Sequence, residues 1–261
     1  MKYIPFERKV YEAQGEHHTV QVFDRGKRRE LRFGNHIVQS THIAAVPDIL
    51  QLDYTRVMIG GLALMTDLTH MLHVGLGGGT IPRFIHRHWP DVRQTVVELS
   101  PEVIDVAYRF FDLPSSHRLE VIAGDGAQFL SRGTRRFDAI YLDAYHAEGA
   151  SPEVQNIDTL LAARGRLNTA GWLFCNAWGS HQESLRRLTR QLREIFPVLY
   201  AISVRQDSNV IFFGSVDAQL PPPHALMTRA KGLAQRIPVD FPDVVRRLKP
   251  VAATSERLQQ H

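Results

Sequence analysis

The sequence has a single cysteine among its 261 residues. A disulfide within the chain is therefore excluded, and the place of Cys175 in an apolar run at 171–176 predicts a buried strand residue rather than a nucleophile. The N-terminus lacks a basic segment followed by an apolar one, and no apolar stretch approaches the ~20 residues that a membrane-spanning helix needs. We therefore expect a cytoplasmic protein that has no membrane partner.

Metal-binding patterns are also missing. The 13 histidines include no HExxH motif and no paired Cys/His spacing, so no metal site is expected. Lysine and arginine number 31 against 27 acidic residues, a formal net charge of +4. The basic residues form short clusters without interleaved aromatic residues, which favours a solvated surface over nucleic-acid binding. These clusters lie at 27–29, 135–136, 186–187 and 246–247.

One stretch, residues 71–100, has the organisation of a βαβ unit. Its pattern predicts an apolar strand at 72–74, a glycine turn at 75–79, an amphipathic helix at 80–88 and a second strand at 94–97. Glu98 follows the second strand. Glycines leave no side chain between the backbone and a ligand, and an acidic residue at this place can accept both hydrogen bonds of a ribose diol. The unit therefore predicts half of a nucleotide-type cofactor site.

The glycine spacing indicates which cofactor. A dinucleotide fingerprint requires glycine or alanine five places after the first glycine. That place is Thr80, and the glycines fall instead in alternation at Gly75, Gly77 and Gly79. This spacing is typical of proteins that bind S-adenosylmethionine-type sulfonium cofactors, which carry no phosphate. A structural turn without a ligand is the alternative, and Glu98 makes it less favoured.

Strands and helices alternate between residues 70 and 195, which predicts an α/β fold with a doubly wound, mostly parallel sheet. Residues 18–40 predict a small antiparallel β unit before it, joined to it by a helix with an apolar face at 50–65. A further helix is expected at 153–163. The predicted division is an N-terminal β unit at 1–48, a Rossmann-like catalytic domain at 49–215 and a C-terminal helical tail at 216–261.

Acidic residues follow two further strands of this predicted sheet. Asp125 lies between two glycines after the third strand, and Asp143 follows the continuously apolar strand at 137–142. Ligands of doubly wound sheets bind at the carboxyl ends of the strands, where Glu98 and the glycine turn are also expected. The sequence therefore predicts one site at this edge. A helix cap or a polar strand end is the structural alternative for Asp143.

Several short segments of the chain occur in one characteristic order. They are VFD at 22–24, VQS at 38–40, DYTRVM at 53–58, GLGGGT at 75–80, VVELSPEVIDVA at 96–107, GDG at 124–126, FDAIYLDAYHAEGA at 137–150 and NVIFFG at 209–214. With them the chain resembles the spermidine synthases, the polyamine aminopropyltransferases, from about residue 20 to 214. The resemblance implies a seven-stranded sheet like that of class I S-adenosylmethionine-dependent methyltransferases, and a homodimer.

The resemblance also implies a co-substrate, decarboxylated S-adenosylmethionine, and roles for the residues that match. Glu98 is expected to hold its ribose, Asp125 its adenine, and the glycine turn to pass beneath its thioether. Asp143 matches the catalytic aspartate, which orients the attacking amine and accepts its proton. The residues placed at the cofactor are Gln39, Gly75, Gly77, Gly78, Gly79, Glu98, Asp125 and Gly126.

Three departures from the family pattern remove negative charge. Gly78 stands where the family has an aspartate for the ammonium of the aminopropyl arm, His146 replaces an acid that meets the diamine, and a Tyr-His-Glu segment reads Tyr-Thr-Arg at 54–56. The first loss weakens the preference for decarboxylated over intact S-adenosylmethionine. The residues expected to bind the acceptor, putrescine or another small amine, are Tyr54, Tyr145, His146 and Glu148, where the tyrosines offer aromatic faces to a cationic chain.

Three functions stay open. The first is aminopropyl transfer to a diamine, with methylthioadenosine as the second product. The second is methyl transfer from S-adenosylmethionine to a small amine, which Gly78 favours. The third is a non-catalytic cofactor-binding homologue, against which the presence of Glu98, Asp125 and Asp143 counts. A nucleic-acid methyltransferase is less favoured because no Asn-Pro-type motif follows the fourth strand.

Overall fold

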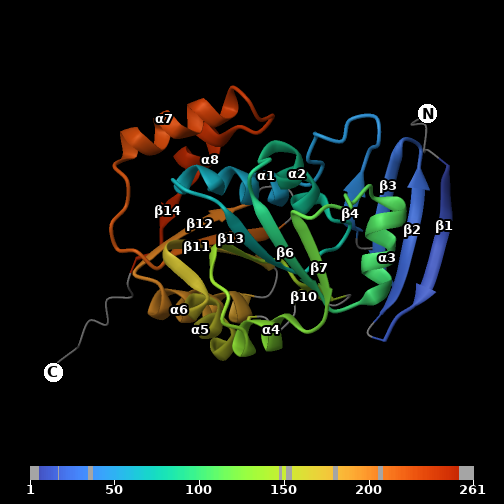
Figure 1. The fold of residues 1–261 in the computed structure, drawn as a ribbon, viewed down its shortest axis with the longest axis horizontal. Coiled ribbons are helices and arrows are strands. Elements are labelled where there is room, and N and C mark those ends of the chain that lie inside the picture. The colour runs from blue at the N-terminus through green and yellow to red at the C-terminus, as the bar shows by residue number, and fades with distance from the viewer. Residues whose placement is uncertain are drawn as a thin grey trace.

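A central sheet organises the computed structural model, which describes residues 6–16, 18–34, 38–146, 149–150, 155–178, 182–204 and 208–252 (Figure 1). Within these residues the sheet has eight strands in the order β14-β12-β13-β11-β8-β5-β6-β7. The parallel strands are β5 (His70–Val74), β6 (Arg93–Glu98), β7 (Leu119–Ala123), β8 (Phe137–Leu142) and β11 (Leu167–Trp178). The antiparallel edge consists of β13 (Asn209–Ser215), β12 (Val198–Ser203) and β14 (Lys249–Pro250). The predicted fold class is confirmed, and β14 is one short strand beyond the expected seven.

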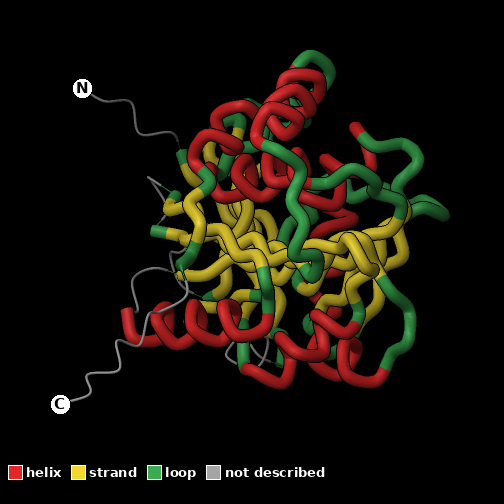
Figure 2. The backbone as a smooth tube through the Cα atoms, turned by 90° about the vertical axis from the view of Figure 1, so that its left-hand side faces the viewer, coloured by secondary structure: helices red, strands yellow, loops and turns green. Residues whose placement is uncertain are grey.

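Helices cover both faces of this sheet, as Figure 2 shows edge-on. Alternate residues of each strand enter different cores: Met71 and Tyr141 pack on one side of the sheet, and Leu72 and Ile140 on the other. This double burial explains why the strands read as continuous apolar runs. The first face carries α1 (Asp53–Gly60) with the short helix η1 (Gly61–Leu64), α2 (Thr80–His88) and α3 (Pro101–Phe110). The second carries α4 (Gly126–Arg132), α5 (Ile157–Gly165) and α6 (Gln182–Ile195).

A four-stranded antiparallel sheet precedes the central one, in the order β1-β2-β3-β4. Its strands are β1 (Glu7–Gln14), β2 (Thr19–Arg25), β3 (Arg28–Phe33) and β4 (Val38–His42). The predicted antiparallel unit is confirmed, and β1 is an additional strand. The sequence signal for β1 is weak because most of its side chains are exposed or partly exposed at the sheet edge. Val20, Val22 and Leu31 pack against α3, which places this sheet beside the carboxyl ends of β5 and β6.

The C-terminal segment packs against the first face through α7 (Pro223–Ala234) and α8 (Phe241–Arg247). A Cβ atom on Gly60 would lie 2.4 Å from Cγ2 of Val244, so α1 and α8 approach each other through a glycine. This segment is thus part of the main core. The division of the chain at residues 48 and 215 stays a prediction.

Local features at the helix starts and at the single cysteine complete the fold. Ser100 accepts a hydrogen bond from the Val103 amide at 3.3 Å and caps the start of α3. Helix α5 begins at Ile157 with Asn156 as its N-cap, later than expected, and the expected start at residue 153 lies outside the described residues. The expectation of a buried strand residue at Cys175 is confirmed, and burial raises the pKa of its thiol to about 12.

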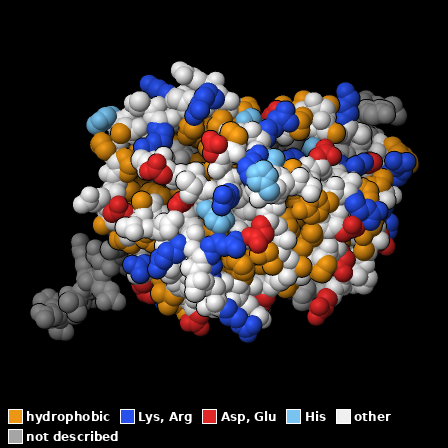
Figure 3. All heavy atoms as spheres, viewed as in Figure 1, with side chains coloured by type: hydrophobic (Ala, Val, Ile, Leu, Met, Phe, Trp, Pro, Cys, Tyr) orange, Lys and Arg blue, Asp and Glu red, His pale blue; other side chains and the backbone are white. Residues whose placement is uncertain are grey.

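The distribution of surface charge and the length of the helices are relevant to binding of nucleic acids and membranes. Figure 3 shows Lys and Arg side chains interspersed with acidic ones over the visible face, with no single basic stripe on it. Among the described residues, no helix is both long and apolar enough to cross a bilayer.

Gly75 lies where the carboxyl ends of β5, β6 and β8 meet, which is the functional edge of the sheet. It has φ +97°, and a Cβ atom there would lie 2.4 Å from the backbone oxygen of Asp143. Its amide donates to the Val97 carbonyl at 2.9 Å, and the Asp143 amide donates to the Val74 carbonyl at 2.9 Å. The turn after β5 therefore touches the loop after β8 at a distance that only glycine permits.

We expect Gly75→Ala to lower the free energy of unfolding by about 2 kcal/mol or more, because it combines a positive φ with a collision against backbone. The matched control is Gly124→Ala at the end of β7, where an added Cβ meets no atom within 4 Å. Urea unfolding of both variants tests this. Equal losses in the two variants would contradict the close approach.

Candidate active site

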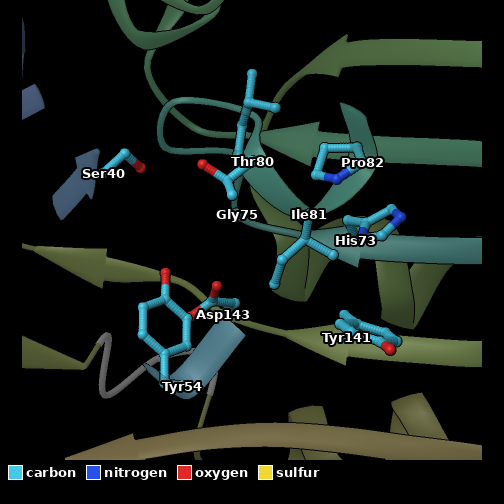
Figure 4. A pocket seen from close by; sticks show the side chains of 10 residues that line it. Ser40, Tyr54, His73, Gly75, Thr80, Ile81, Pro82, Tyr141 and Asp143 are labelled. Carbon is cyan, nitrogen blue, oxygen red and sulfur yellow. The ribbon is translucent and has the colours of Figure 1, made fainter. Parts of the chain in front are cut away.

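A cleft lies at the carboxyl edge of the sheet (Figure 4). It brings together three residues that the sequence analysis singled out, namely Tyr54, Gly75 and Asp143. Figure 4 shows Tyr54 and Asp143 side by side, with Ser40 across the cleft and His73 and Tyr141 at its far end. The described residues that line it are Ser40, Tyr54, His73, Gly75, Leu76, Thr80, Ile81, Pro82, Tyr141 and Asp143.

Ser40, on strand β4, holds the glycine turn from the side of the N-terminal sheet. Its hydroxyl accepts a hydrogen bond from the Gly78 amide at 2.8 Å. A Cβ atom on Gly78 would lie 2.8 Å from the Ser40 Cβ and 2.9 Å from the Phe111 ring. The missing aspartate at position 78 therefore has a steric reason in this chain: the space beside the turn is filled by Ser40 and Phe111.

Glu98 ends strand β6 with its carboxylate held by backbone amides. The Leu76 amide donates to Oε2 at 2.8 Å, and the Ser100 amide donates to Oε1 at 3.0 Å. Burial raises the pKa of Glu98, and these amides oppose that effect by stabilising the ionised form. The amides of Leu99 and Gly77 also contribute to this stabilisation, and because Leu76 lines the cleft, the carboxylate is anchored at the cleft's edge.

Asp125 and Gly126 have structural roles of their own. Asp125 is the N-cap of α4, where its Oδ1 accepts from the amides of Ala127 and Gln128 at 2.7 and 3.0 Å. A Cβ atom on Gly126 would lie 2.3 Å from Cγ1 of Val74, so α4 begins in close contact with β5. The predicted contact of Asp125 and Gly126 with the adenine stays a prediction, in addition to these structural roles.

Asp143 is a partly buried carboxyl that side chains on two other elements contact. The Asn176 amide donates to its Oδ1 at 2.8 Å, and the Tyr54 hydroxyl bonds to it from the start of α1. Burial raises the pKa of Asp143 to about 7, and both hydrogen bonds lower it. The helix-cap alternative is excluded, because a short strand, β9 (Tyr145–His146), follows Asp143 and the next described helix is capped by Asn156. The arrangement provides a carboxyl that can take up or release a proton near neutral pH.

Asn176 is a site residue that the sequence analysis missed. It interrupts an apolar run and is 2% exposed. Strand β11 pairs with β8 so that Cys175 lies opposite Leu142, which puts Asn176 beside Asp143. The sequence signal for Asn176 was a polar residue within a buried strand. Its place beside Asp143, however, follows only from the register between β11 and β8, which the sequence does not reveal.

His73 is a second cleft residue without a sequence prediction. Its Nε2 lies 2.9 Å from Oε1 of Gln94, and the Gln94 amide nitrogen donates to the Pro82 carbonyl. That arrangement places the ring proton on Nε2. Burial lowers the pKa of His73 to about 4, so it is neutral at neutral pH.

The remaining predicted residues are placed as follows. Gln39 precedes Ser40 on strand β4 and is not among the described residues that line the cleft. Tyr145 and His146 form β9, which pairs with β10 (Gly149–Ala150). Glu148 lies outside the described residues. The roles predicted for these four residues stay predictions.

Comparisons with known proteins identify the family of the chain. Residues 52–215 match the family model of the spermine/spermidine synthase domain. A polyamine aminopropyltransferase of Chromobacterium violaceum is 29% identical over 94% of this chain and 95% of its own length. A polyamine aminopropyltransferase of Neisseria meningitidis serogroup A is 32% identical over 72% of each chain.

Solved structures show the same fold. A probable spermidine synthase from Corynebacterium glutamicum superposes with a TM-score of 0.72 at 18% identity, covering 96% of this chain and 99% of its own. Human methyltransferase-like protein 13, in complex with SAH, gives a TM-score of 0.66 at 23% identity, covering 80% and 98%. The family match extends from α1 to the end of β13 and includes the described residues that line the cleft, except Ser40. On this evidence the chain is a transferase that belongs to the spermine/spermidine synthase family.

Proposed function

We propose that this protein transfers an aminopropyl group from decarboxylated S-adenosylmethionine to a small diamine such as putrescine, and releases methylthioadenosine. The observation that carries the proposal is the Asp143 carboxyl, which Tyr54 and Asn176 hold in the cleft beside Gly75. The names of the curated relatives, polyamine aminopropyltransferases, support it. A homodimer is part of the same proposal and follows from the family resemblance, and a cytoplasmic location is proposed with it.

The co-substrate site is proposed around the glycine turn. Glu98 accepts the two ribose hydroxyls, since backbone amides already fix its carboxylate at the cleft's edge. Gly75, Gly77, Gly78 and Gly79 pass beneath the thioether without side chains. Asp125 and Gly126 lie at the adenine, with Gln39 as a further contact. No metal takes part in the proposed transfer.

Asp143 supplies the base that this chemistry needs. The acceptor nitrogen attacks the carbon next to the sulfonium, so an N–C bond forms, the C–S bond breaks and its electron pair neutralises the sulfur. The nitrogen must be unprotonated and held in line about 3 Å away, whereas aliphatic amines are mostly ammonium at neutral pH. A carboxylate whose conjugate acid has a pKa of about 7 both positions the amine and accepts its proton.

Tyr54, Tyr145, His146 and Glu148 are the proposed contacts for the rest of the acceptor. Tyr54 stands closest to the chemistry, because its hydroxyl bonds Asp143 and its side chain lines the cleft. An aromatic wall suits a cationic alkyl chain.

Methyl transfer from S-adenosylmethionine to a small amine is the second candidate. Its support is Gly78, which leaves the glycine turn without a carboxylate to repel the carboxylate of intact S-adenosylmethionine. Ser40 and Phe111 fill the place of that side chain.

The product released separates the two candidates. Purified protein is given decarboxylated or intact S-adenosylmethionine with a panel of amines, and the nucleoside is identified by mass spectrometry. We expect methylthioadenosine from the decarboxylated co-substrate, and the amine consumed names the acceptor. Adenosylhomocysteine from the intact co-substrate would replace the first candidate with the second, and neither product would overturn both.

Asp143→Asn should lower kcat by about 100-fold or more and leave methylthioadenosine affinity nearly unchanged, because it removes the base and keeps the shape. In the wild type, the raised pKa means that the active carboxylate form is lost as the pH falls through about 7, so kcat/KM should decrease from pH 8 to pH 6. Asp105→Asn, which removes the same charge on the exposed face of α3, is the control. Unchanged turnover in Asp143→Asn would remove that residue from the mechanism.

Glu98→Gln should act on binding instead. The substitution keeps the size of the side chain and removes the charge that accepts the ribose diol, so we expect KM for the co-substrate to rise about 10-fold or more with kcat within a few-fold. Calorimetric titration with methylthioadenosine checks this without turnover. An unaltered affinity would show that the ribose lies elsewhere.

A further inference from the structure

Two amide side chains stand in series behind the Asp143 carboxyl. Asn176 Nδ2 donates to Asp143 Oδ1 at 2.8 Å, and Asn209 Nδ2 donates to Asn176 Oδ1 at 2.8 Å. Asn209 begins strand β13, and it is not among the described residues that line the cleft. Gln155 donates to the backbone oxygen of Asn176 at 2.9 Å and so fixes the strand at this point.

The chemistry of the three groups gives this series one direction. An ionised carboxyl can only accept, so Asn176 must turn its NH₂ group toward Asp143. The Asn176 oxygen then points to Asn209, which must donate. A hydrogen bond received at the amide oxygen polarises the amide and strengthens its N–H as a donor. Without Asn209, Asn176 would lose this hydrogen bond at its oxygen and, with it, the polarisation that strengthens its bond to Asp143.

We propose that Asn209, acting through Asn176, is a positioning residue that favours the ionised form of Asp143 and keeps one of its oxygens bound to Asn176. The chain of bonds carries the effect from an antiparallel strand outside the cleft to the group that faces the acceptor. The consequence for turnover rests on the proposed aminopropyl transfer. The consequence for the ionisation of Asp143 does not.

Other groups around Asp143 stay in one charge state near neutral pH. The Cys175 thiol on the same strand as Asn176 has a pKa raised to about 12 by burial, and burial also raises the pKa of Tyr141. His73 is neutral, because burial lowers its pKa to about 4. Tyr54 faces Asp143 from α1 as a hydroxyl donor. A titration of Asp143 between pH 5 and pH 9 is therefore not complicated by these described neighbours.

Substituting Asn209 by aspartate should reverse the direction of the hydrogen bonds that link residue 209, Asn176 and Asp143, a series called the relay below. An aspartate cannot donate, so the Asn176 amide turns its NH₂ group toward residue 209 and its oxygen toward Asp143. An amide oxygen favours the protonated carboxyl, which can donate to it. We expect the ¹³C NMR titration midpoint of the Asp143 carboxyl carbon to rise by at least one pH unit in Asn209→Asp, with the resonance assigned from Asp143→Asn.

Ser208→Asp is the matched control. Ser208 is exposed and next to Asn209, so this variant adds the same charge at nearly the same place and leaves both amides intact. In Ser208→Asp, the titration midpoint of Asp143 should rise by less than half as much as in Asn209→Asp. Asn176→Leu and the uncharged Asn209→Leu remove donors without adding charge, and both midpoints should also rise, with the larger shift for Asn176→Leu. Thermal unfolding confirms that each variant is folded.

Two results would overturn the relay. One is an equal shift in Asn209→Asp and Ser208→Asp, which would reduce the effect to charge alone. The other is an unchanged midpoint in folded Asn176→Leu. If the protein releases methylthioadenosine, the pH below which kcat/KM falls should shift to higher values. The size of this shift should rank the variants in the same order as the NMR midpoints. If no amine yields that product, the titration still tests the relay, and the two failures are distinguishable.

Discussion

The contact between Gly75 and the backbone of Asp143 is the constraint on which the functional edge depends. Parallel pairing places β5 between β6 and β8, and the bonds from Gly75 to Val97 and from Asp143 to Val74 join the three strand ends. Any side chain at position 75 would force the loop after β8 outward. The glycine turn and the carboxyl at Asp143 are therefore held within one short distance by the sheet itself.

Two carboxyls near this contact experience burial in different ways. Backbone amides of Leu76 and Ser100 bind both oxygens of Glu98, which suits a permanent acceptor for hydroxyl groups. Asp143 is bound by the side chains of Asn176 and Tyr54, and burial raises its pKa to about 7. In the proposed transfer, Glu98 acts as a rigid acceptor for the co-substrate, and Asp143 acts as the base that an attacking amine needs.

Local sequence signals predicted much of this arrangement and left out its tertiary part. The helix at 80–88 and the strand at 137–142 have the bounds expected from glycine punctuation and apolar pattern, and Asp143 lies at the strand end as predicted. Ser40 and Asn176 were missed because each reaches the site through a register between distant segments. Asp125 shows the reverse: its sequence position suggested a ligand contact, and the structure adds a helix cap.

A crystal structure of the protein with methylthioadenosine and an amine is the measurement that tests the central claim most directly. The account predicts ribose hydroxyls on the Glu98 carboxylate, sulfur above Gly75 and the amine nitrogen about 3 Å from Asp143. A nucleoside bound with its ribose away from Glu98, or an amine that makes no contact with Asp143, would contradict it.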